Sequence, residues 1–141
     1  MEELFALLIL NCEEIIIDDR YYKKLHELFL NNPENNDLLY LEWESDIKKS
    51  SYYIKNHIDL NTFNYKLFGI FLMQNLKIYY EKCSDIKIFA SKMYILWLSL
   101  PENIKDKEPF FSLNYLDEPL SWGDKEQTRT ICENMLNYYN N

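Results

Sequence analysis

The sequence predicts an all-α fold, and three observations support this prediction. Only two glycines and four prolines occur in 141 residues, so residues that favour tight turns are scarce. Hydrophobic residues make up 48% of the chain, enough for one core at a length typical of a single domain. Several stretches repeat apolar residues at helical spacing. We therefore expect residues 1–141 to form a single compact bundle of about six helices, with one long irregular loop before the last helix.

The first two helices are expected at residues 3–17 and about 19–31. The first is apolar nearly all round at its start, which indicates a buried helix, and the β-branched residues 15–17 can end it in an extended turn. The second presents an apolar stripe at helical spacing, made of Tyr21, Leu25, Leu28 and Phe29. Residues 31–36, NNPENN, should break it, because proline and asparagine favour turns.

A third helix is expected at about residues 37–56. Its apolar side would carry Leu39, Trp43, Ile47 and Ile54, with Trp43 in the core. Its polar side would carry Glu42, Asp46 and Lys49, so that two carboxylates share one helix face.

The fourth helix, residues 63–81, is apolar on most sides and is expected at the centre of the core. Asn61 or Thr62 can cap its start. Gly69 within it would allow a neighbouring helix to approach closely, because glycine has no side chain.

Two further helices complete the prediction. Ser84 is the expected N-cap of the fifth, whose apolar stripe runs to Leu100, the residue before Pro101. The last helix, about 125–139, packs through Ile131, Met135 and Tyr138. Residues 101–123 between them show no helical period, but their many aromatic residues argue against disorder.

The start of the last helix carries its own signals. Asp124 can be its N-cap with Gln127 at the third helical position, and Gly123 lets the chain turn sharply into that cap. Trp122 is expected to pack beneath the entering loop.

Charge and cysteine usage indicate the compartment and the partner. The net charge of −8 is uneven: residues 1–46 carry twelve acidic and three basic residues, and residues 47–95 carry three acidic and eight basic residues. This balance disfavours nucleic acid as a direct ligand and favours a basic protein. The acidic start, the short apolar runs and three widely spaced cysteines, Cys12, Cys83 and Cys132, predict a cytoplasmic protein with free thiols and no membrane span.

The sequence gives no catalytic, metal or cofactor signature. With two glycines far apart, no phosphate-binding loop, dinucleotide-binding loop or nucleophile elbow can form. His26-Glu27 lacks the second histidine of a zinc-protease motif, because Leu30 stands at that position. We therefore expect no metal, no cofactor and no enzyme activity.

One alternative is catalytic. Arg20 and His26, separated by five residues on a predicted helix, resemble the R-x(4-6)-H pattern of HEPN-type ribonucleases, which are all-helical domains of similar size. The resemblance implies that the arginine and the histidine act on the scissile phosphate, which their chemistry permits. It covers these two residues only.

Two acidic and aromatic stretches are the predicted partner-binding residues. The first contains Glu42, Glu44 and Asp46 beside Tyr40 and Trp43. The second, residues 110–124, contains no basic residue and contributes Tyr115, Asp117, Glu118, Trp122 and Asp124. Tyrosine and tryptophan are typical interface anchors, and unneutralised carboxylates steer a basic partner toward the surface.

In size, acidity and lack of catalytic residues, the whole chain resembles bacterial immunity proteins, including those of contact-dependent growth inhibition systems. The resemblance implies a cognate toxin domain, such as a basic nuclease, that the protein neutralises by stoichiometric binding. A phage-type inhibitor of a nucleic-acid enzyme, similar to anti-CRISPR proteins, shares this electrostatic logic. A helical scaffold without inhibitory activity is a third interpretation.

Overall fold

The computed structural model describes residues 1–57, 59 and 61–140. Within these ranges the chain forms eight α-helices and two 3₁₀ helices and contains no strand, which confirms the predicted all-α class. The bounds are α1 (Glu2–Cys12), α2 (Arg20–Asn31), α3 (Asn36–Trp43), α4 (Ile47–His57), α5 (Tyr65–Lys82), α6 (Ile86–Ser99), α7 (Ser112–Tyr115), η1 (Glu118–Trp122), α8 (Lys125–Leu136) and η2 (Tyr138–Asn140).

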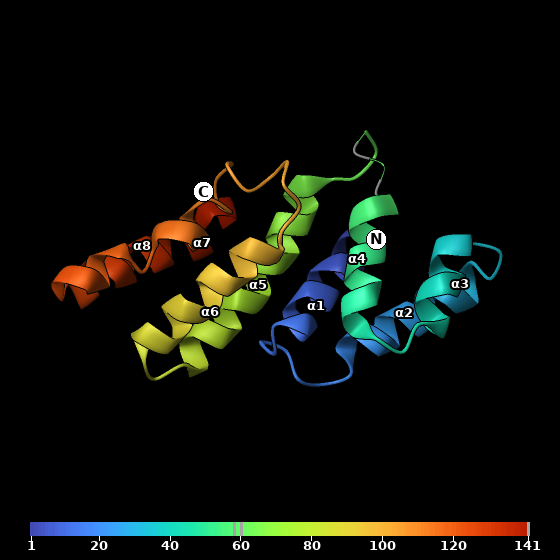
Figure 1. Cartoon of the computed structure of the whole chain (residues 1–141), viewed down its shortest axis with the longest axis horizontal. Helices are drawn as coiled ribbons and strands as arrows, with labels where there is room; N and C mark the ends of the chain where they lie inside the picture. Colours follow the sequence, from blue (N-terminus) through green and yellow to red (C-terminus); the bar gives the residue numbers. More distant parts are fainter. Residues whose placement is uncertain (58, 60, 141) are drawn as a thin grey trace.

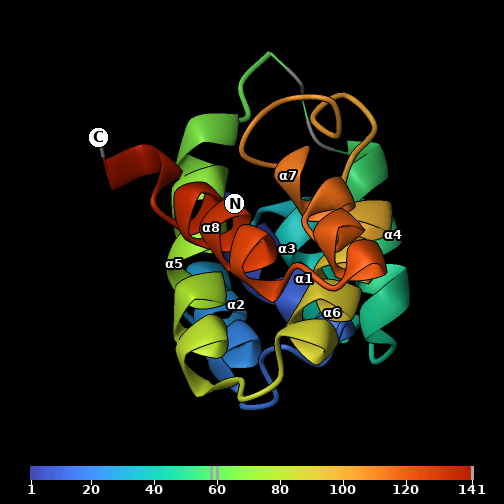
Figure 2. The same cartoon turned by 90° about the vertical axis from the view of Figure 1, so that its left-hand side faces the viewer.

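The helices form an elongated bundle with α3 at one end and α8 at the other (Figure 1). Seen from the α8 end, α5 lies on one side and α4 and α6 lie on the other (Figure 2). The helix α1 runs through the middle and contacts α2, α4, α5 and α6. The two ends of the bundle therefore present separate surfaces that share one core.

The centre of the core is α1 rather than the predicted fourth helix. Residues 4–10 of α1 are all buried, because this stretch is apolar on every side. The helix ends at Cys12, earlier than the expected end at residue 17. The chain then turns through Glu14, which has a φ of 57°, and buries Ile15 and Ile16. In contrast, α5 buries one face against α1 and leaves Gln74, Lys77 and Ile78 exposed.

The predicted helix 37–56 is wrong as one element. It divides into α3 and α4, and Glu44 between them has an extended backbone (φ −83°, ψ 119°). The carboxylate of Asp46 accepts a hydrogen bond from the Lys48 N–H at 3.0 Å, so Asp46 sits before the new helix start. Apolar spacing continues across the break, which explains why periodicity alone missed it.

The predicted caps of two later helices are also displaced. Asn64 caps α5 in place of Asn61 or Thr62, and Asp85 caps α6 in place of Ser84. In each case the side-chain oxygen accepts a hydrogen bond from a first-turn N–H. The structure confirms Asp124 as the N-cap of α8, where it accepts a bond from the Gln127 N–H at 3.0 Å.

Residues 101–123 are more ordered than the predicted irregular loop. They include α7 and η1, and they bury Ile104, Phe110, Leu113 and Leu116 in the core. The chain after α8 is anchored as well. Tyr139 of η2 packs against Gly69 of α5, so the close approach predicted at Gly69 comes from a tyrosine ring.

Candidate functional site

The predicted partner-binding residues do not form one site. Tyr115, Asp117, Glu118, Trp122 and Asp124 lie on α7, η1 and the start of α8, and we name them the η1 surface. Glu42, Trp43, Glu44 and Asp46 lie at the end of α3 and in the link to α4, and we name them the α3 surface. The two surfaces are at opposite ends of the bundle (Figure 1).

The η1 surface is held in shape by the turn that precedes α8. Gly123 has a φ of 78°, a left-handed conformation that favours glycine, and its N–H bonds to the Leu120 carbonyl at 3.1 Å. The Asp124 N–H bonds to the Pro119 carbonyl at 3.0 Å, and Pro119 itself is buried. The exposed residues of η1 are therefore presented on a backbone with few free conformations.

Trp122 is exposed, which corrects the prediction that it packs beneath the loop. Its exposed fraction is 59%, and a Cβ on Gly123 beside it would meet no other atom within 4 Å. The buried residues of this segment are instead Leu116 and Pro119. An exposed tryptophan on a rigid turn is the kind of side chain that anchors a protein partner.

Tyr115 is a predicted contact that takes part in hydrogen bonds within the fold. Its hydroxyl donates to the Glu108 carboxylate at 3.2 Å and lies 3.2 Å from the Ser112 hydroxyl. The Ser112 hydroxyl donates to the other oxygen of Glu108. This network fixes α7 to the preceding turn, and the half-buried Tyr115 supports the η1 surface rather than standing out from it.

The η1 surface presents the carboxylates of Asp117, Glu118 and Asp124. Glu118 is exposed, Asp117 is half-buried, and neither takes part in an ion pair within the described part of the chain. Asp124 differs because its carboxylate caps α8. Two carboxylates are therefore free to meet a cation from another molecule.

The α3 surface differs from its prediction in two respects. Glu42 and Asp46 do not share a helix face, because α3 ends at Trp43, and Glu42 instead bonds to the His26 ring at 2.9 Å. Trp43 is 83% exposed rather than part of the core, since no helical turn follows to cover it. Lys48 and Lys49, in the first turn of α4, are exposed and line a hollow together with Tyr40 of α3, so this end carries both signs of charge.

Next to the α3 surface, three rings form a stacked column that the sequence did not reveal. Tyr53 lies between Tyr40 and His57, with 3.9 Å between the centroids of each pair. The Tyr53 hydroxyl donates to Asp37 at 2.8 Å, and this hydrogen bond raises the pKa of Tyr53. The rings come from α3 and α4, so their meeting depends on the break that sequence periodicity missed.

Arg20 and His26 have separate partners. The Arg20 side chain donates to Asp18 at 3.1 Å and to the Asn75 side chain at 3.0 Å, whereas His26 bonds to Glu42. The residues of the ribonuclease alternative are thus each engaged in bonds within the fold.

Burial makes the Cys12 and Cys132 thiols poor nucleophiles. Burial raises the pKa of Cys12 to about 11 and that of Cys132 to about 12, which disfavours the thiolate at neutral pH. Among the residues that the structure describes, no group of three His, Cys, Asp or Glu side chains is placed to hold a metal ion.

Sequence reasoning missed the exposed face of α6. Ile88, Tyr94, Ile95 and Leu98 are each 40–55% exposed, while the opposite face of the helix is buried. The composition of residues 86–98 could have indicated this face, because apolar side chains occur on all sides of the helix. A helix on one side of a bundle cannot bury every side, so some of them must be exposed.

Comparisons with protein families, curated proteins and solved structures found no significant match to this chain. In the ranges that the structure covers, no helix combines the length and apolarity required to cross a membrane.

Proposed function

We propose that this chain is a non-catalytic inhibitory protein that binds a cognate basic toxin domain, most simply a nuclease, through the η1 surface. The observation that carries the proposal is the exposed indole of Trp122 on a rigid turn beside Asp117 and Glu118, which form no ion pair among the described residues. The proposed role is that of an immunity protein, with one copy binding one toxin domain.

The chemistry of a nuclease explains why such a surface would inhibit it. Active sites that hold phosphates are positively charged, so an acidic surface accelerates association and competes with the substrate. Trp122 would supply the apolar contact area that charge alone cannot, since large aromatic anchors dominate the binding energy of most interfaces. Steering by carboxylates and anchoring by an indole are complementary contributions.

The η1 surface suits a basic partner better than the α3 surface does. No lysine or arginine occurs in residues 108–124. At the α3 surface, the exposed Lys48 and Lys49 would repel a basic partner, and Glu42 is already bonded to His26. The α3 surface therefore provides a matched control, with an exposed tryptophan in a different electrostatic setting.

The test measures affinity for a basic toxin domain encoded beside this gene in its host. Trp122→Ala should weaken binding about 100-fold, and reversing Asp117 and Glu118 to lysine should weaken it by a similar factor. Asp124 is left unchanged, because it caps α8 and its loss would also lower stability. Titration calorimetry gives both the affinity and the one-to-one stoichiometry.

The control variants are Trp43→Ala and Glu44→Lys, which should leave the affinity within a factor of about three. Loss of binding in these variants with full binding by Trp122→Ala would reject the η1 surface. A toxin domain that binds but keeps its full activity would reject the inhibitory role. Finding the gene among phage genes instead would favour the anti-defence interpretation, which needs the same kind of surface.

A further inference from the structure

The outward face of α6 consists of Lys87, Ile88, Ser91, Tyr94, Ile95 and Leu98, all of which are exposed. Four of these six are large and apolar. The solvent face of a surface helix normally carries charged and polar residues, so this composition requires another explanation. A contiguous apolar stripe of this kind marks an interaction surface.

The rest of the chain cannot cover this face. The opposite side of α6 is already buried through Phe89, Ala90, Met93 and Leu96, and the helix contacts α1, α7 and α8. Rotating the helix to hide Ile95 would expose Phe89 and Met93, which are fully buried. Another molecule is therefore needed to cover the stripe.

We propose that the outward face of α6 packs against the same face of a second copy of this chain, with the two helices antiparallel. In this register Ile88 lies opposite Leu98 of the second copy, and Ser91 lies opposite Ile95. The pairing of a small residue with a large one lets the two apolar rows interdigitate at the usual helix separation of about 8–10 Å. The contact is isologous, so it closes as a dimer.

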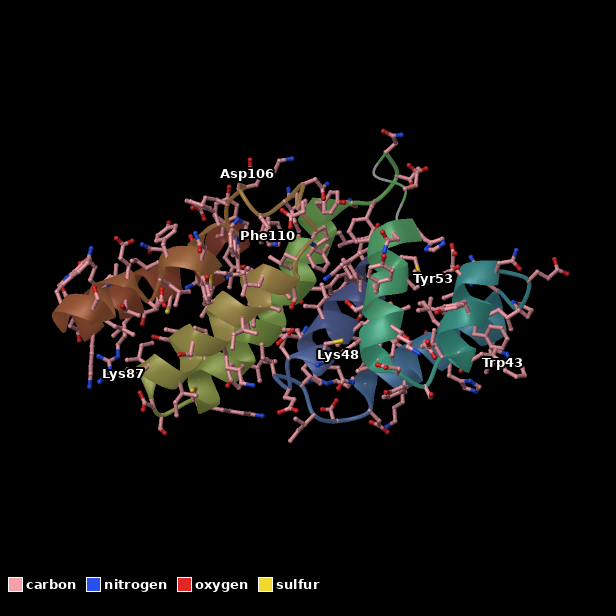
Figure 3. All side chains as sticks on the ribbon, viewed as in Figure 1. Trp43, Lys48, Tyr53, Lys87, Asp106 and Phe110 are labelled. Atoms are coloured by element: carbon pink, nitrogen blue, oxygen red, sulfur yellow. The ribbon has the colours of Figure 1, made fainter. Side chains whose placement is uncertain are left out.

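Charge favours the antiparallel arrangement. Lys87 lies at the start of α6, whereas Asp106 follows its end, and Figure 3 places Lys87 and Asp106 at opposite ends of this helix. Glu102 also follows the end of α6, but it is already paired with Lys105 at 2.9 Å. Antiparallel packing brings Lys87 toward Asp106 of the second copy and aligns the helix dipoles favourably. A parallel arrangement would bring Lys87 against Lys87. Within the described residues neither Lys87 nor Asp106 has an ion-pair partner.

The same charges argue against the basic toxin as the occupant. Residues 86–99 contain no acidic residue and two lysines, so a basic protein would find no carboxylate on this helix. The α6 face and the η1 surface therefore differ in the partner that each one suits, and the dimer does not depend on the proposed inhibitory function.

The experiment measures molar mass by light scattering or sedimentation over a range of concentrations. Wild-type protein should approach twice the chain mass of 17.2 kDa as concentration rises. Ile95→Lys and Ser91→Asp should each remain monomeric. A mixture of the two variants should form a heterodimer, because the antiparallel register brings the carboxylate introduced in one chain against the ammonium introduced in the other. The second Ser91–Ile95 contact of that heterodimer stays native.

The control is Ile17→Lys, which changes an isolated isoleucine that is 87% exposed and should dimerise like wild type. Each variant should keep the helical circular dichroism and the melting behaviour of a folded monomer, since all the changed side chains are exposed. Monomeric wild-type protein at every concentration, or a dimer that survives Ile95→Lys, overturns the proposal. Failure of the mixture to dimerise overturns the antiparallel register.

Discussion

Tyr139 packs directly against the backbone of α5 at Gly69, which lies 70 residues earlier in the chain. A Cβ at Gly69 would overlap the hydroxyl and ring of Tyr139, so the absence of a side chain in the middle of α5 is what admits the tyrosine. Burial raises the pKa of Tyr139 to about 12, in keeping with a hydroxyl held against the protein. At the residue scale, this contact anchors the C-terminal segment.

The effect of Gly69→Ala on the free energy of unfolding should therefore have opposite signs in wild-type protein and in a Tyr139→Ala variant. In wild-type protein it should lower the free energy of unfolding by about 1 kcal/mol, because the Tyr139 ring must move away. In a Tyr139→Ala background it should raise that free energy by about 1 kcal/mol, since alanine is the better helix former. Urea unfolding of the wild type, the two single variants and the double variant gives the coupling free energy between positions 69 and 139. Equal effects of Gly69→Ala in both backgrounds would show that Tyr139 does not dock on α5.

At the scale of elements, α1 carries the largest share of the packing. It contacts four other helices, and its apolar residues from Leu4 to Leu10 have almost no exposed surface. Removal of one of these side chains leaves a cavity that several helices border, and all of them would have to shift to fill it.

Leu8→Ala should lower the free energy of unfolding by about 3 kcal/mol, because Leu8 is fully buried at the middle of α1. Ile17→Ala removes an apolar side chain that is exposed and should change the stability by less than about 0.5 kcal/mol. Chemical denaturation measures both. A small loss for Leu8→Ala would mean that α1 is not the centre of the core.

Elements with both a periodic stripe and a capping signal were predictable from sequence. The bounds of α2 and the start of α8 lie within about one residue of expectation, since Asp124 and Gly123 mark the helix start chemically. The break after Trp43 was missed because residues 44–46 contain neither glycine nor proline, although Asp46 is a good capping residue. Apolar periodicity in the sequence predicts that a helix exists, but a recognisable capping residue is needed to predict where it begins or ends.

For the candidate site, the sequence predicted which residue types it contains but not how they are arranged in space. Sequence identifies base-free, acidic stretches, but it cannot show that the residues 42–46 and 115–124 lie at opposite ends of the bundle. It also placed Trp43 inside, because a tryptophan at stripe spacing is usually core, and Trp122 beneath the loop, because a large aromatic residue beside a helix start is usually anchored. Which side of a helix faces outward depends on contacts between distant segments, and the same limit hid the exposed face of α6.

At the scale of the whole molecule, charge is divided along the chain. Residues 1–46 have a net charge of −9, and residues 47–95 have a net charge of +5. The elements of the second group, α4, α5 and α6, thus form a basic middle between acidic segments. The two proposals assign a basic partner to the η1 surface, outside this middle, and self-association to the outward face of α6.

Stability should fall in alkaline solution. Burial raises the pKa of Cys132 to about 12 in the folded protein, above the ordinary value of 9.0, so folding favours the protonated thiol. This contribution is complete below the pKa of the unfolded thiol and is lost as pH rises toward the folded value. The loss of this contribution should lower the free energy of unfolding by about 2 kcal/mol between about pH 8 and about pH 10.5.

Urea unfolding at the two pH values measures this loss. Cys132→Ala lowers stability at both pH values through its cavity, so the informative quantity is the difference between them, which should shrink in the variant. An unchanged difference would show that the Cys132 thiol does not titrate with folding.

The placement of the three tryptophans also gives the protein optical reporters. Trp97 is partly buried, donates its Nε1–H to the Lys105 carbonyl at 3.0 Å and lies beneath the Lys105 ammonium at 5.1 Å from the ring centroid. Trp43 and Trp122 face water at opposite ends. Their emission is therefore open to dissolved quenchers, and a molecule that covers one end of the bundle would shield one indole and leave the other unchanged.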